Sequence, residues 1–82
     1  MKIQIEDFKT GWFGISMGIK KSEIDILIEG LTNLKKNTAQ HFHVRSNYEG
    51  KGGVGDIEIF IENEDTPDNS VIDLSPAISP NR

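Results

Sequence analysis

Residues 22–36 read SEIDILIEGLTNLKK, and this stretch decides the fold. Its apolar side chains recur three and four positions apart, which is the spacing of one face of an α-helix. Ser22 is a suitable N-cap, and Asp25 three residues later resembles a weak capping box. The pattern predicts one helix over 22–36, ended by Asn37 in a left-handed conformation. The apolar face of this helix consists of Ile24, Leu27, Ile28, Leu31 and Leu34.

The segments on both sides of this helix alternate polar and apolar residues, which is the period of a half-buried β-strand. Two strands are expected before it, over 2–7 and 12–19, and the turn at Gly11 makes them an antiparallel hairpin. Two more are expected after it, over 40–46 and 56–62, joined by a loop rich in glycine.

The predicted order is ββαββ, an α+β two-layer sandwich in which one helix packs on a four-stranded, mainly antiparallel sheet. Gly30 would allow the helix to approach the sheet closely. We assign a single domain to 1–63 and an acidic, proline-containing tail to 64–82, partly ordered, with a short fifth edge strand possible at 71–74. The sheet side of the core would contain Ile3, Ile5, Phe13, Ile15, Met17, Phe42, Val44, Ile57, Ile59 and Ile61.

The overall composition excludes several classes of function. The 82 residues carry a net charge of −4, which argues against nucleic acid as the partner because phosphates are bound mainly by Lys and Arg. The chain has no cysteine, so disulfides, thiolate metal sites and cysteine nucleophiles are excluded. Neither a signal peptide nor a membrane span is evident in the sequence, and we expect a cytoplasmic protein without a membrane partner.

The second face of the predicted sheet combines aromatic, basic and acidic side chains. Large aromatic residues carry much of the binding energy in interfaces, so this face predicts a protein-binding surface. Two alternatives are a solvated face with cross-strand ion pairs, and a face whose aromatic residues are covered by 71–74. The expected partner-binding residues are Trp12, His41, His43, Arg45, Tyr48, Asp56, Glu58, Phe60 and Glu62.

The pair His41 and His43 is the nearest approach to a metal motif. Residues two apart on a strand share a face, so both imidazoles could reach one ion together with Asp56 or Glu58. Such pairs arise often by chance and a third histidine is missing. The favoured interpretation is that both histidines pair with acids or face a partner, and no metal or other cofactor is expected.

No catalytic motif accompanies these residues. The loop 49–55 has four glycines and a lysine, but a phosphate loop leads into a helix, whereas this one leads into a strand. No serine has the surroundings of an activated nucleophile. The sequence therefore predicts a protein that is not an enzyme.

Three segments resemble the small α+β immunity proteins that are encoded beside bacterial polymorphic toxins. They are SEID at 22–25, HFHVRS at 41–46 and GDIEI at 55–59, and Trp12 corresponds to a tryptophan that accompanies that fold. The resemblance covers roughly 1–63. It implies a non-catalytic inhibitor of a cognate toxin, and a basic toxin domain would suit this acidic chain. In that role the carboxylates Glu6, Asp56, Glu58 and Glu62 would meet basic groups, with Trp12 and Phe60 as anchors.

Two other functions remain open. One is a small-ligand or metal-binding module that uses His41 and His43. The other is a structural homodimer whose open sheet faces pair, which the small residues Gly14, Ser16 and Gly18 would permit. The sequence thus leaves a monomer and a homodimer as alternatives.

Overall fold

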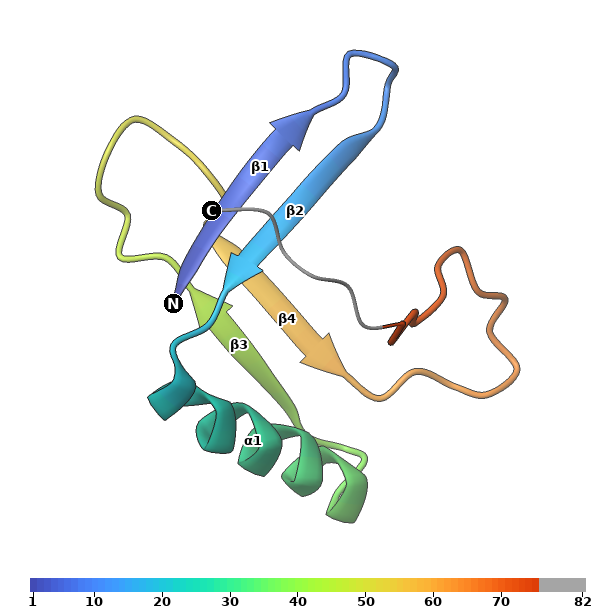
Figure 1. The fold of residues 1–82 in the computed structure, drawn as a ribbon. Helices are drawn as coiled ribbons and strands as arrows, with labels where there is room; N and C mark the ends of the chain where they lie inside the picture. The colour runs from blue at the N-terminus through green and yellow to red at the C-terminus, as the bar shows by residue number, and fades with distance from the viewer. Residues whose placement is uncertain (76–82) are drawn as a thin grey trace.

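A computed structural model describes residues 1–75, which form one α-helix and two β-hairpins (Figure 1). The elements are β1 (Lys2–Asp7), β2 (Phe13–Gly18), the 3-10 turn η1 (Lys21–Glu23), α1 (Ile24–Lys36), β3 (His41–Arg45) and β4 (Asp56–Phe60). The predicted order ββαββ and the α+β class are confirmed. Strand β1 has the predicted bounds, and the other three strands are one or two residues shorter at their ends.

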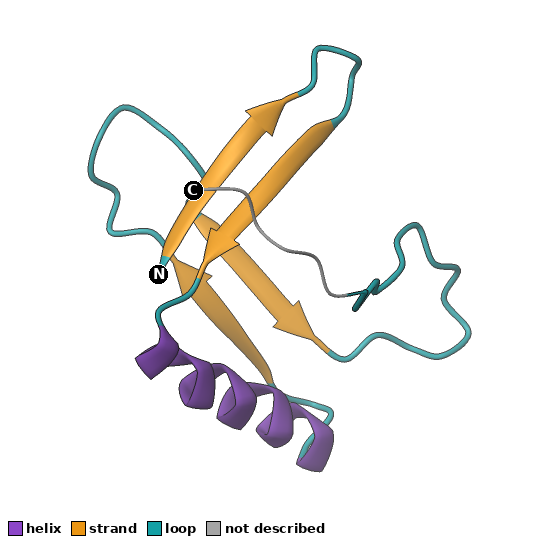
Figure 2. Cartoon of the chain, in the orientation of Figure 1, coloured by secondary structure: helices purple, strands orange, loops and turns teal. Residues whose placement is uncertain are grey.

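The four strands do not form one sheet. In residues 1–75 they make two separate antiparallel pairs, β1 with β2 and β3 with β4, so the prediction of a four-stranded sheet is wrong. Figure 2 shows the hairpins as distinct orange pairs, with α1 running beside β3. Alternation determines which residues share a face of a strand, but it contains no information on which strands become neighbours.

The register within each hairpin agrees with the predicted faces. Ile3 lies opposite Met17 and Ile5 opposite Ile15. In the second hairpin, Phe42 lies opposite Ile59 and Val44 opposite Ile57. Each hairpin therefore has one largely apolar face, as expected from the period of two.

The loop between β1 and β2 is held by local contacts. Asp7 Oδ1 accepts a hydrogen bond of 2.8 Å from the backbone N–H of Lys9, which has a φ of 56°. Gly11 has a φ of 95°, the positive value predicted for the turn. The ring of Phe8 lies over Gly14, where an added Cβ would stand 2.6 Å from Phe8 Cζ. An aromatic ring over a strand glycine supplies packing that the glycine itself lacks.

The start of the helical segment is stabilised by the side chain of Glu23, and not by the predicted N-cap Ser22. The Glu23 carboxylate accepts hydrogen bonds of 2.9 Å from the backbone N–H of Lys20 and from the Met1 ammonium. Ser22 lies inside the turn η1, so the predicted box with Asp25 is not formed. The ammonium, followed by the Lys20 N–H, lowers the pKa of Glu23.

Replacing Glu23 by Gln is expected to lower the thermal midpoint at pH 7, because the ion pair with Met1 is lost. A carboxyl whose folded pKa is lowered contributes stability above its unfolded value, near 4.5, and loses that contribution as the pH falls through the folded value. The difference between wild type and Glu23→Gln should therefore shrink on acidification below about pH 4.5. Circular dichroism melts between pH 3 and pH 7 would measure it. Glu29→Gln is the matched control in the same helix, and a difference independent of pH would contradict the assignment.

The end of α1 also differs from the prediction. Asn37 has a φ of −137°, which is extended and not left-handed. Its side-chain oxygen instead accepts a hydrogen bond of 3.2 Å from the N–H of Ala39, and its own N–H donates to Asn33 O at 2.9 Å. Asparagine therefore ends this helix through an Asx-type turn.

The packed part of the molecule lies between α1 and β3. Leu34 is 3% exposed and is the one buried apolar side chain in the described part of the chain. Leu27 and Gly30 lie on the same side of the helix and are half-buried. A Cβ added to Gly30 would stand 3.2 Å from Cε1 of Phe42, so the close approach expected at this glycine is confirmed.

Much of the expected core is exposed. On α1 the exposed fractions are 42% for Ile24, 54% for Ile28 and 48% for Leu31, and the apolar face of β1 and β2 is equally open. The helix face was predicted to pack on the apolar face of one four-stranded sheet and so to bury these residues. That prediction is wrong because the first hairpin does not join the second in one sheet. We call this set the open apolar surface; it comprises Ile5, Phe13, Ile15, Met17, Ile24, Ile28 and Leu31.

The tail does not add a fifth strand within the described residues. After β4 the chain continues to Ser75 without a helix or strand, and Val71, Ile72 and Leu74 are 88%, 90% and 85% exposed. The part of the predicted tail that follows Ser75 lies outside the described residues. No helix within 1–75 has the length and apolar character that a membrane crossing requires.

Candidate functional site

The outer face of the second hairpin holds six of the nine predicted partner-binding residues. The register places them in three cross-strand pairs on one side of the sheet. This face is opposite to the one that carries Phe42 and Val44, because successive residues of a strand alternate. The pairs are His41 with Phe60, His43 with Glu58, and Arg45 with Asp56.

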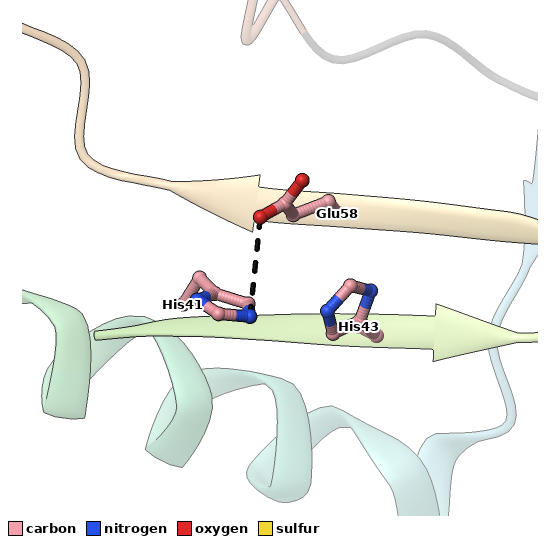
Figure 3. A group of neighbouring side chains, drawn as sticks. All are labelled: His41, His43 and Glu58. Carbon is pink, nitrogen blue, oxygen red and sulfur yellow. Dashed lines mark ion pairs between the residues drawn. The ribbon is translucent and has the colours of Figure 1, made fainter.

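Charged contacts connect these residues across the strands. His43 Nδ1 lies 2.9 Å from the Asp56 carboxylate, and Arg45 Nε lies 3.7 Å from the same group. His41 Nε2 lies 3.9 Å from Glu58 Oε1 (Figure 3). The cross-strand ion pairs proposed from the sequence are therefore present. Exposed pairs of this kind typically contribute only about 0.2–1 kcal/mol each, so they do not explain the fold by themselves.

The other three predicted residues lie elsewhere. Trp12 belongs to the loop of the first hairpin and is 77% exposed. Tyr48 is in the glycine loop, where its ring stands beside Gly55. Glu62 follows β4 and accepts hydrogen bonds from the N–H of Asn63 and the hydroxyl of Thr66 in a turn. The structure thus keeps six of the nine residues on one face of the second hairpin and places the other three in two loops and a turn, Tyr48 in the loop where it was expected.

Trp12 and Phe60 are not covered by residues 71–74. They are 77% and 53% exposed, and the apolar residues of that segment are themselves open to solvent. The alternative in which the tail shields both aromatic rings is therefore wrong for the described residues.

A groove opens where β2, α1 and β3 approach one another. Its volume is about 470 Å³, and most of its lining is apolar. Ligand and peptide sites in proteins are usually concave and apolar, with a few polar groups that fix orientation. The apolar lining comes mainly from Met1, Met17, Ile19, Ile26, Leu27, Phe42 and Val44, with Glu23, Glu29, Asn33, His43 and Arg45 at the polar positions.

The open apolar surface and this groove were not identified as a site from the sequence. Their residues have the period of core residues, and periodicity alone cannot distinguish a face that covers its own sheet from one that a partner covers. The sequence contained one relevant signal, the short length, because small domains bury a smaller share of their surface.

We compared the chain with models of protein families, with curated proteins and with solved structures, and none of them matches.

Proposed function

We propose that this chain is a non-catalytic protein-binding module whose partner covers the open apolar surface. The observation that carries the proposal is the exposure of Ile5, Phe13, Ile15 and Met17, which is 40% or more for each of these residues. They form one face of a hairpin that has no second layer in the described residues. A contiguous apolar face of this kind is rare on proteins that act alone.

The total exposed area supports the same proposal. The chain exposes 8002 Å², whereas a folded monomer of this length is expected to expose about 4,900 Å². Among the described residues, the large apolar side chains of the open apolar surface are each 40% exposed or more, and those of 71–74 are 85% or more. A standard interface buries only about 800 Å² on each partner, so the chain has enough exposed area for one.

The resemblance to immunity proteins supports a basic toxin domain as the partner. The net charge of −4 would attract such a domain and accelerate the encounter. Asp56 and Glu58 lie together on the outer face of the second hairpin, and the acidic turn with Glu62 follows directly. These carboxylates would form the charged rim, and the apolar residues of the first hairpin would form the centre of the interface.

The proposal is tested by two substitutions at neighbouring positions of β2. Ile15→Asp places a charge in the open apolar surface, and Ser16→Asp places the same charge on the opposite face of the same strand. Binding to the product of the adjacent gene, measured by titration calorimetry, should weaken at least about tenfold with Ile15→Asp and change little with Ser16→Asp. Equal effects of the two variants would remove this face from the interface.

A second copy of the chain is the competing partner for the same surface. The molecular mass of the chain alone, measured by sedimentation in the ultracentrifuge, distinguishes a homodimer from a monomer. A homodimer that Ile15→Asp dissociates would make a second copy the occupant of this surface, and one that only Ser16→Asp dissociates would be the homodimer expected from the sequence. A monomer that binds the adjacent gene product would favour the immunity function.

A further inference from the structure

Three metal-binding side chains meet on the outer face of the second hairpin. His41, His43 and Glu58 each offer one ligand atom, and these atoms lie within 4.8 Å of one another. The register explains the meeting, because His43 lies directly opposite Glu58 and His41 is the next residue on the same face. Figure 3 shows the two imidazoles side by side on β3, with the Glu58 carboxylate reaching toward them from β4.

The spacing is close to that of a bound zinc ion. Ligand atoms around a tetrahedral Zn²⁺, at about 2.0–2.1 Å from the metal, are about 3.4 Å apart. His41 Nε2 and Glu58 Oε1 are already 3.9 Å apart. The three ligand atoms lie within 4.8 Å of one another, and the side chains of His41 and Glu58 are about half exposed, at 51% and 50%, which leaves them room to rotate toward an ion.

An independent contact orients His43 as a ligand. Its Nδ1 lies 2.9 Å from both oxygens of Asp56, and a carboxylate only accepts hydrogen bonds, so Nδ1 carries the proton. In a neutral imidazole with this tautomer Nε2 has the free lone pair, and Figure 3 shows one ring nitrogen of His43 on the side of His41. A carboxylate that holds the far nitrogen of a ligating histidine is a regular part of zinc sites.

We propose that His41, His43 and Glu58 bind one Zn²⁺ ion, with Asp56 as a positioning residue for His43. Two imidazoles and one carboxylate suit zinc, whereas Mg²⁺ and Ca²⁺ prefer oxygen ligands to imidazole nitrogen. Three protein ligands leave the fourth position of the ion to water or to a group of another molecule. The site shares Asp56 and Glu58 with the rim of the proposed interface, but its ligands all belong to this chain, so the chain alone should bind the ion.

Titration calorimetry of the full chain with Zn²⁺ tests the site, and we expect one ion per chain. Glu58→Gln and Glu62→Gln remove the same charge from the same region, but only Glu58 belongs to the cluster. The first should weaken binding at least about tenfold and the second less than about twofold, because only a lost ligand affects the affinity strongly. Equal losses would show that zinc binds a diffuse acidic surface, which overturns the proposal.

Asp56→Asn tests the positioning role separately. Loss of such a partner typically weakens metal binding about 10–100-fold while the ligands remain. The chain has 2 histidines, so its NMR spectrum contains two sets of imidazole signals, and both should shift when one equivalent of Zn²⁺ is added. Imidazole signals that stay in place, or full displacement of zinc by an equal concentration of Mg²⁺, would also overturn the proposal.

Discussion

Replacing Leu34 by Ala is expected to lower the free energy of unfolding by about 2–5 kcal/mol, because the residue is buried and its surroundings relax only in part. Leu34 is 3% exposed and belongs to α1, the helix that lies beside β3 in Figure 1. A chain this small has a total stability of only about 5 kcal/mol or somewhat more, so the loss is close to the whole. Urea unfolding followed by circular dichroism measures it. Leu34→Met, which conserves volume, should cost less than about 1.5 kcal/mol.

Leu31 provides the matched control, since it is the same residue type one turn earlier on the same helix. It is 48% exposed, so Leu31→Ala should cost well under half as much as Leu34→Ala. Equal costs for the two substitutions would contradict the structure, because they would mean that Leu31 is covered in solution. The ratio of the two costs therefore measures how open the helix surface is when no partner is present.

Replacing Gly30 by Leu is expected to destabilise the chain by about 1–3 kcal/mol, although leucine is the better helix former by nearly 1 kcal/mol. The cause is steric, because even a Cβ at this position would stand 3.2 Å from Cε1 and 3.3 Å from Cζ of Phe42. The larger side chain must push the ring away and so separate α1 from β3. Urea unfolding at neutral pH measures the change.

A double-mutant cycle with Phe42→Ala assigns the effect of Gly30→Leu to that ring. Once the ring is removed, Gly30→Leu should become neutral or stabilising, because leucine fills the vacated space and improves the helix. Coupling energies of about 0.5–3 kcal/mol are usual for residues in contact. If the two substitutions are additive, then the helix does not pack on Phe42 in solution.

The local structure of this chain could be predicted from its sequence, since its signals are local. The period of 3.6 identified the helix, and the period of two identified four strands and the faces of each hairpin. The predicted caps of α1 were wrong at both ends of the helix. The bond from the Lys20 N–H to Glu23 is local, three residues apart, and was missed because Ser22 was taken as the N-cap. The Met1 ammonium could not be foreseen, because the path of the first hairpin brings it to Glu23 from 22 residues away.

The pairing of the hairpins could not be predicted, since it depends on contacts between residues far apart in the chain. The same apolar residues of β1 and β2 could pack against α1 or bind another protein. The sequence pattern is identical in the two cases, so it cannot distinguish them. The prediction of the candidate site was right within one hairpin and wrong between the two hairpins. The alternation placed His41, His43, Asp56 and Glu58 together, as the register confirms, but Trp12 was assigned to a sheet that it does not share.

The separation of the hairpins has a further consequence for how the chain behaves at high concentration. In the described residues β2 pairs only with β1, so its other edge presents unused backbone donors and acceptors. Its sequence, FGISMG, carries no charge. Unpaired uncharged strands are templates on which strands of other molecules add and fibrils grow. Gly14 and Gly18 lower the β-propensity of this edge, and Lys20 and Lys21 follow it closely, so both the glycines and the lysines oppose such growth.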